Sequence, residues 1–159
     1  MKILLATDGS PCSEAAIEEV ARRPWPADTQ VRVVSIVERP APLVAEPHLL
    51  ASGYFEEAEK ICRRQAEDAV KLAAAKLGSG QNSDPLVSTQ VLDGSAKRTI
   101  VEEAEAWGAD LIVVGSHGYR SWERMLLGSV SQAVAAHAKC SVEIVRCRKA
   151  VSGQPSAVS

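Results

Sequence analysis

The sequence predicts an α/β domain in which helices cover both faces of an open parallel sheet. Two observations predict this class. Short apolar or β-branched runs alternate with helical patterns along the chain, and this alternation is typical of a parallel sheet. The 159 residues, 46% of them hydrophobic and 24% charged, suit one globular domain with a single core. We therefore expect one domain over residues 1–148 and a disordered tail over 149–159, where no pattern remains.

The start of the chain predicts a strand, a helix and a second strand. Residues 2–7 form a short apolar run that the sequence DGSP ends. Ser10 fits a helix N-cap, with Pro11 at the first helical position. The apolar residues that recur at helical spacing are Ala16, Ile17, Val20 and Ala21. The prolines of RPWP end this helix, and the β-branched run 31–37 predicts the second strand.

The middle of the chain predicts a loop and a long helix. Residues 40–53 contain three prolines and no clean period, so we expect a loop there. A helix is expected over 55–77, with charges on its outer face. Its inner face is expected to hold Ala58, Cys62, Ala66, Ala69, Ala73 and Leu77. Gly78 is the expected C-cap, and the polar run after it is interpreted as a loop.

The C-terminal half predicts three strands and two helices. Strands are expected over 86–92, 110–114 and 142–146. The run 110–114 is almost wholly apolar, which is typical of a central parallel strand. A helix over 96–107 is expected to turn its apolar residues, Ile100, Val101 and Ala104, inward. A short helix carries Val130, Ala133, Val134 and His137.

Charge and hydropathy argue against several classes of partner. The net charge is −2 and no lysine or arginine run stands out, so we expect neither a nucleic acid nor a membrane surface as a partner. The apolar runs are far shorter than a membrane span, and the apolar part of MKILLATDGS is too short for a signal peptide. We therefore expect a cytoplasmic protein.

The four cysteines, Cys12, Cys62, Cys140 and Cys147, form no recognisable motif. They show neither a C-x-x-C spacing nor a histidine at zinc-site spacing. In a reducing compartment we interpret them as small buried hydrophobes rather than as metal or redox groups.

Two loops with glycine predict a ligand site. In an open parallel sheet, ligands bind beyond the carboxyl ends of the strands, where the strand order reverses. The first strand ends in the turn 7–10, and the fourth ends in the sequence Gly115-Ser116-His117-Gly118. Both strands are strongly apolar and are expected to be central and adjacent, which places both loops on one crevice.

The start of the short helix predicts where an anion would bind. Gly128 and Ser129 lie just before this helix, and the N–H groups and dipole of a helix start favour a phosphate. Ser129 and Ser131 add hydroxyl donors, and Arg120 and Arg124 can reach phosphates from the intervening segment. The Walker A run and the dinucleotide pattern G-x-G-x-x-G are both missing from the sequence.

The stretch from Gly115 to Ser129 reads G-x-x-G, nine residues (119–127), then G-[ST]. This pattern resembles the ATP-binding pattern of the universal stress protein family. The start, ILLATDGSPCSEAAIEEV, resembles the family's first strand, acidic turn and helix, and ADLIVVGSHGYRSWERMLLGSVSQAVAAHAKCSVEIVR resembles its C-terminal third. The resemblance covers residues 2–146.

The resemblance implies a five-stranded parallel sheet in the order 3-2-1-4-5, a Rossmann-like fold that binds ATP between the first and fourth strands. A divalent metal, Mg²⁺ or Mn²⁺, is implied on the phosphates. Ala6, Thr7 and Asp8 would lie by the adenosine, Ile36 would line the base, and Val114, Gly115, Ser116 and His117 would flank the nucleotide. Gly118, Gly128, Ser129, Val130 and Ser131 would hold the phosphates.

The resemblance also implies a homodimer through the last strand, 142–146. The apolar residues Val142, Ile144 and Val145 would otherwise form an exposed edge. Family members often have proline after the cysteine that precedes this strand, whereas Cys140 is followed here by Ser141. This departure concerns the dimer geometry and not the nucleotide site.

Simpler roles remain open for several of these residues. Asp8 can act as a helix-capping residue, and Gly118 and Gly128 as ordinary turn glycines. His117 fits a loop residue at the rim, because neither an acid nor a nucleophile is recognisable beside it in the sequence. Tyr119 and Trp122 can stack on a base or pack on the surface.

Four functions are compatible with these sequence features. The first is a nucleotide-binding stress or signalling protein, which the pattern favours. The second is a slow ATPase or phosphotransferase, although the sequence shows no arranged general base. The third is a response-regulator receiver, which needs clustered acids and a lysine after the last strand, where Arg146 stands. The fourth is a dimeric interaction module that binds no nucleotide.

Overall fold

The computed structural model of the chain describes residues 1–38, 54–78, 85–118 and 127–147. Its elements run, in order, β1 (Lys2–Ala6), α1 (Pro11–Arg22), β2 (Gln30–Val37), α2 (Tyr54–Gly78), β3 (Leu86–Asp93), α3 (Ala96–Trp107), β4 (Leu111–Gly115), α4 (Ser129–His137) and β5 (Ser141–Val145). Where the sequence predicted a range, the element is present and its ends differ by at most one residue. The expected loop at 40–53, the loop after Gly78, Tyr119, Arg120, Trp122, Arg124 and the tail lie outside the described residues.

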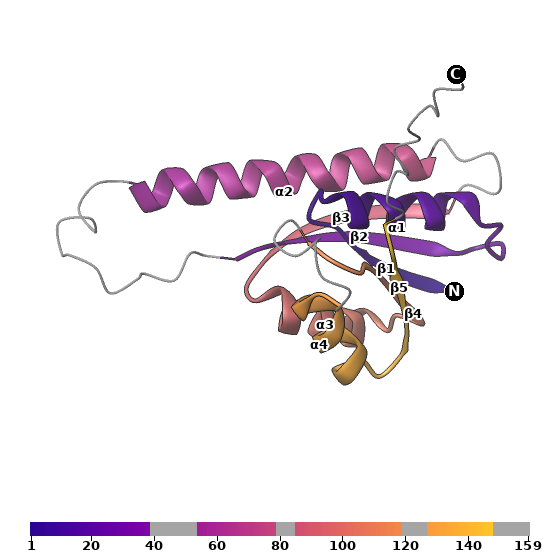
Figure 1. The fold of residues 1–159 in the computed structure, drawn as a ribbon. Coiled ribbons are helices and arrows are strands. Elements are labelled where there is room, and N and C mark those ends of the chain that lie inside the picture. The colour runs from indigo at the N-terminus through magenta and orange to yellow at the C-terminus, as the bar shows by residue number, and fades with distance from the viewer. Residues whose placement is uncertain (39–53, 79–84, 119–126, 148–159) are drawn as a thin grey trace, which may run out of the picture.

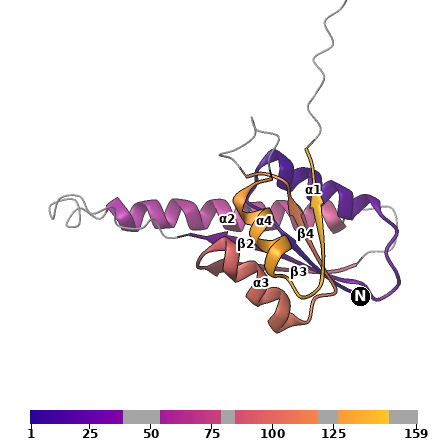
Figure 2. The same cartoon turned by 60° about the horizontal axis from the view of Figure 1, so that its bottom comes forward.

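The sheet has the expected parallel order, β3-β2-β1-β4-β5. β1 is central and pairs in parallel with β2 on one side and with β4 on the other. Helices α1 and α2 cover one face, and α3 and α4 cover the opposite face (Figure 1, Figure 2). The α/β class and the strand order are therefore both confirmed.

The alternation of side chains along β1 builds two separate cores. Ile3 and Leu5 pack with α1 and α2 on one face, while Leu4, between them, packs with α3 and α4 on the other. All three side chains are fully buried. A continuously apolar strand is therefore required, because successive side chains point to opposite faces that are both covered.

Helix α2 departs from its predicted inner face. The buried positions are Ala66, Val70, Ala73 and Leu77, whereas Cys62 is exposed. Figure 1 shows the reason: the N-terminal part of α2 projects past the strands, so nothing in the sheet covers it. Gly78, the expected C-cap, is instead the last residue of the helix.

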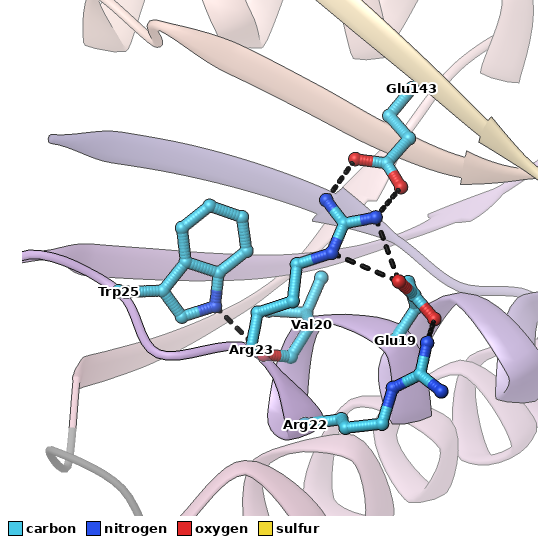
Figure 3. Close-up of polar contacts among 6 residues, drawn as sticks. All are labelled: Glu19, Val20, Arg22, Arg23, Trp25 and Glu143. Carbon is cyan, nitrogen blue, oxygen red and sulfur yellow. Dashed lines mark hydrogen bonds and ion pairs between the residues drawn. The ribbon is translucent and has the colours of Figure 1, made fainter.

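The C-terminal end of α1 is fixed to the edge strand β5 by Arg23. Its guanidinium donates to both carboxylate oxygens of Glu143, at 2.7 and 2.6 Å, and also to Glu19 on α1 at 2.7 and 2.9 Å (Figure 3). The bonds with Glu143 raise the pKa of Arg23, and the hydrogen bonds from Arg23 lower the pKa of Glu19. Arg22 also pairs with Glu19. One arginine thus joins a helix end to the edge of the sheet.

Within the described residues, no helix combines the length and apolarity needed to span a membrane.

Candidate functional site

The loops after β1 and β4 meet at one edge of the sheet, as predicted. The two strands pair in parallel, with Leu5 beside Val113, so their carboxyl ends lie together. The strand order reverses between them, which is where ligands bind in open α/β sheets. The Ser10 hydroxyl donates to the carbonyl of His117 at 3.3 Å and so ties one loop to the other.

The loop after β1 is held by its own side chains. Thr7 is buried, and its hydroxyl donates to the Ser13 hydroxyl (3.2 Å) and accepts from the Gly9 N–H (3.2 Å). Gly9 has a φ of 76°, a left-handed conformation that favours glycine. The Asp8 carboxylate accepts from the Ser10 N–H at 3.0 Å. Asp8 itself is exposed, so its carboxylate is accessible at the mouth of the site.

Three glycines allow backbones to approach closely around the second loop. A Cβ on Gly115 would lie 2.6–2.8 Å from backbone atoms of Cys12 and Ser13. On Gly118 it would lie 2.7 Å from a carboxylate oxygen of Asp8, and on Gly128 it would lie 3.1 Å from the carbonyl oxygen of Ser116. None of the three has a left-handed φ. These glycines are therefore required by close approach and not by backbone conformation.

Ser116 joins three elements at the centre of this site. It is 1% exposed. Its N–H donates to the carbonyl of Val145 at the end of β5 (2.7 Å), and its carbonyl accepts from the Gly128 N–H (2.8 Å). That carbonyl also accepts from the Ser131 hydroxyl (3.1 Å). The peptide of Ser116 thus positions the start of α4 against β4 and β5.

The Ser131 hydroxyl is directed into the protein in the described structure, and its role toward a ligand stays a prediction. Ser131 is buried, and its hydroxyl is directed to the carbonyls of Ser116 and Gly128, the latter at 2.9 Å. This bond stabilises the turn that begins the helix. Ser129 is exposed, so its side chain faces solvent while that of Ser131 does not.

The first turn of α4 presents backbone N–H groups. Its N-cap is Gly128, and in the described structure no side chain caps this end. The first N–H groups of a helix have no partner within the helix, and here these belong to residues such as Ser129 and Val130. With the helix dipole they form a suitable place for an anion.

The predicted apolar contacts lie on the α3/α4 face of the sheet. Val114 is buried in that core, and Ala6, Ile36 and Val130 pack against it while remaining partly exposed. Together they provide an apolar surface at the carboxyl ends of β1, β2 and β4.

A cavity of about 470 Å³ lies at the carboxyl ends of β2 and β3, lined by Glu38, Asp93, Gly94 and Ser95. Its two carboxylates have partners: Glu38 accepts from the Ala96 N–H at 2.7 Å, and Asp93 pairs with Arg63 at 2.7 Å. Two carboxylates disfavour a phosphate, so the start of α4 is the better place for one.

The structure also contains a feature that the sequence reasoning missed. Cys12 and Cys147 form a disulfide, with their Cα atoms 4.5 Å apart, so they are not the unreactive hydrophobes that we expected. The two residues are separated by 135 positions, and therefore no local motif marks them. The available signal was topological: Cys12 begins the helix after β1 and Cys147 follows β5, which puts both at the same edge of a parallel sheet.

The other two cysteines are free thiols. Burial raises the pKa of Cys140, and Cys62 is exposed on α2.

Known proteins resemble this chain over nearly its full length. The family model described as the universal stress protein family matches residues 1–146. A universal stress protein of Methanocaldococcus jannaschii is 32% identical over 145 residues, covering 91% of this chain and 81% of that protein. The solved structure of UspA from Lactobacillus plantarum is 26% identical, with a TM-score of 0.75 over 92% of this chain and 97% of that one.

Two more distant solved structures share the fold and contain nucleotides. One is a universal stress protein in complex with cAMP, 22% identical, with a TM-score of 0.62 over 93% of this chain and 98% of that one. The other is a family protein of Arabidopsis thaliana with AMP bound, 16% identical, with a TM-score of 0.62 over 94% of this chain and 93% of that one.

Proposed function

Because the chain belongs to the universal stress protein family, we propose that it binds ATP between the loops after β1 and β4 and the start of α4. In this proposal it is a cytoplasmic protein that responds to the nucleotide in stress or signalling. The observation that carries the proposal is the convergence of Asp8, Gly118 and Gly128 at the point where the strand order reverses. The distant structures with cAMP and AMP show that this fold can hold an adenine nucleotide.

The proposed orientation places the phosphates at α4. The N–H groups of its first turn favour negative charge, and Gly128 lets the backbone approach closely. The adenosine would lie over β1 and β2, near the partly exposed side chains of Ala6 and Ile36.

The side chains of the proposed site can bind a divalent cation only together with the phosphates of the nucleotide. The described residues contain no group of three or more His, Cys, Asp or Glu side chains that could hold a metal. Within the two loops, Asp8 supplies one carboxylate. Mg²⁺ takes one or two carboxylates and completes its shell with phosphates and water, so in the proposal the phosphates would hold the cation, and the cation would neutralise their charge.

Two of the alternative functions are less well supported. The strand order 3-2-1-4-5 differs from the order 2-1-3-4-5 of response-regulator receivers, which excludes the receiver interpretation.

The alternative of an enzyme would need a nucleophile or a general base. The Ser116 hydroxyl lies 3.0 Å from His117 Nδ1, but Ser116 is 1% exposed. We therefore interpret this pair as holding the loop and not as a nucleophile with its base.

We further propose a homodimer through β5. This strand is at the edge of the sheet and pairs with β4 alone among the described strands. Its apolar residues Val142, Ile144 and Val145 are only partly buried. An uncovered apolar edge of this kind is a surface for pairing with another strand.

The nucleotide proposal is tested on protein freed of bound small molecules. We expect Mg-ATP to give a saturable heat by titration calorimetry with the wild-type protein. Gly118→Ala should weaken binding about tenfold, because the new Cβ would displace the Asp8 carboxylate, 2.7 Å away, and occupy the space of the ligand. Asp8 is exposed and can move, so this variant should stay folded.

Gly78→Ala is the matched control, because at Gly78 a Cβ would meet no described atom within 4 Å. It should bind Mg-ATP like the wild type. Absence of any saturable heat, or equal affinity in wild type and Gly118→Ala, would contradict the proposed site. Phosphate release measured on the same samples decides whether ATP is hydrolysed.

A further inference from the structure

We propose that Cys12 and Cys147 are a thiol–disulfide switch that controls nucleotide affinity, with the disulfide as the tighter-binding form. This inference rests on the proposed function, since it assigns a regulation to the same site. Its starting point is the position of the bond, which joins the first turn of α1 to the residue two positions beyond β5.

The bond lies directly against the loop that follows β4. Cys12 is 3% exposed, and its backbone is in such close contact with Gly115 that a Cβ there would lie 2.6 Å away. The Ser116 hydroxyl lies 3.8 Å from the Cys12 sulfur. One side of the disulfide therefore touches the first two residues of the glycine loop.

Cys147, the other half of the disulfide, is connected to Ser116 through the backbone of β5. The carbonyl of Val145, two positions before Cys147, accepts the Ser116 N–H at 2.7 Å. The carbonyl of Ser116 in turn accepts the N–H of Gly128, which begins α4. The disulfide thus joins the two segments that contact Ser116, namely the start of α1 and the end of β5. Ser116 in turn positions the start of α4, which is proposed to hold the phosphates.

A second connection between α1 and β5 confines the structural change on reduction to the N-terminal end of α1. Arg23, just beyond the far end of α1, donates to both oxygens of Glu143 on β5 (Figure 3). When the disulfide is reduced this ion pair remains and keeps α1 on the sheet. The relaxation is then greatest where Cys12 and Cys147 separate, beside Ser116.

The oxidant can be a small disulfide such as oxidised glutathione. The thiolate of Cys147, which is partly exposed, attacks one sulfur of this disulfide and releases one thiol. Cys12 then attacks the mixed disulfide, releases the second thiol, and forms the internal bond. Two protein thiols and one small disulfide give one protein disulfide and two small thiols. In a cytoplasm such bonds are usually transient or redox-sensing, which suits a switch.

The bond should act by holding the site in its binding conformation. A ligand binds more tightly when less ordering is needed, and couplings between sites typically reach about fivefold or more. We expect the oxidised wild type to bind Mg-ATP at least about fivefold more tightly than the reduced form. By reciprocity, saturating Mg-ATP should shift the glutathione ratio that half-oxidises the pair by the same factor.

The experiment compares wild-type protein equilibrated with oxidised or with reduced glutathione. Intact-mass spectrometry and peptide mapping verify the Cys12–Cys147 bond, circular dichroism verifies folding, and calorimetry with Mg-ATP measures affinity. Cys147→Ser should bind like the reduced wild type in both buffers. Cys62→Ser is the matched control, because Cys62 is an exposed free thiol on α2, and it should keep the full response.

Several results would overturn the switch. One is equal Mg-ATP affinity of the oxidised and reduced wild type, which would leave the proposed function standing. Another is a wild type that forms no Cys12–Cys147 bond with oxidised glutathione, or that unfolds on reduction, since the bond would then be absent or purely structural. No heat in either state would instead remove the proposed function and the switch together.

Discussion

At the scale of single residues, the contact between Gly115 and the start of α1 limits which residue can stand at position 115. The backbone atoms that a Cβ on Gly115 would meet, at 2.6–2.8 Å, belong to Cys12 and Ser13. Backbone atoms in a helix cannot move aside as a side chain can. Gly115→Ala should therefore lower the free energy of unfolding by about 2 kcal/mol, as other overpacked core positions do.

Urea unfolding of Gly115→Ala and of the control Gly78→Ala would measure this. Gly78→Ala should be unchanged or slightly more stable, because alanine is favoured over glycine in a helix. If Gly115→Ala were as stable as the wild type, the close contact between β4 and α1 would be contradicted.

The sequence pointed to the glycines of the proposed site, but it could not predict which contacts each nearby side chain makes. The G-x-x-G and G-[ST] spacing identified Gly118 and Gly128, and the parallel topology brought them to one edge. The inward hydrogen bonds of Ser131 depend on the position of Ser116, fifteen residues earlier. Such contacts depend on tertiary packing, which no local pattern records.

At the scale of elements, the connection between α1 and β5 should depend on pH. Arg23 lowers the pKa of Glu19 below its ordinary value of 4.5. A carboxyl whose pKa is lowered on folding contributes stability above its unfolded pKa and loses it as the pH falls through the folded value. The stability that ionised Glu19 contributes to the folded protein is thus complete near neutral pH and is lost in acid.

Glu19→Gln should therefore be less stable than the wild type by about 0.5–1 kcal/mol near neutral pH, because the pair is partly exposed. The difference should shrink as the pH falls below the unfolded pKa and vanish once Glu19 is protonated in the folded protein. Urea unfolding across this pH range measures it. Glu18→Gln, at an exposed position of the same helix, should show no such pH-dependent difference. A gap between Glu19→Gln and wild type that persisted in acid would show that charge is not its cause.

The order and type of the elements were predicted well, because strands buried on both faces and amphipathic helices have distinct periods. The inward residues Ile100, Val101 and Ala104 of α3 are all buried as expected. The inner face of α2 was wrong at Cys62 because periodicity indicates which side of a helix is apolar, not where the sheet beneath it ends.

At the scale of the whole molecule, the proposed dimer through β5 predicts a difference between the two edge strands of the sheet. If β5 pairs with β5 of a second copy, sedimentation should give twice the monomer mass. The amide hydrogens of β5 that do not bond to β4 should then exchange slowly, because pairing with the second copy protects them. The amides of β3 that do not bond to β2 should exchange rapidly, because β3 is the opposite edge, and they serve as the internal control. A monomer mass at every concentration would contradict this assembly.

The bond between Cys12 and Cys147 has a further consequence for the chain when it is not folded. It closes a ring between positions 135 apart, which holds β2 to β5 and leaves β1, the centre of the sheet, on a short free arm. The chain-entropy relation gives a ring of this size about 5 kcal/mol of stabilisation, all of it by restricting the denatured ensemble. Tolerance to denaturants should then follow the redox state of the surroundings even where no nucleotide is bound.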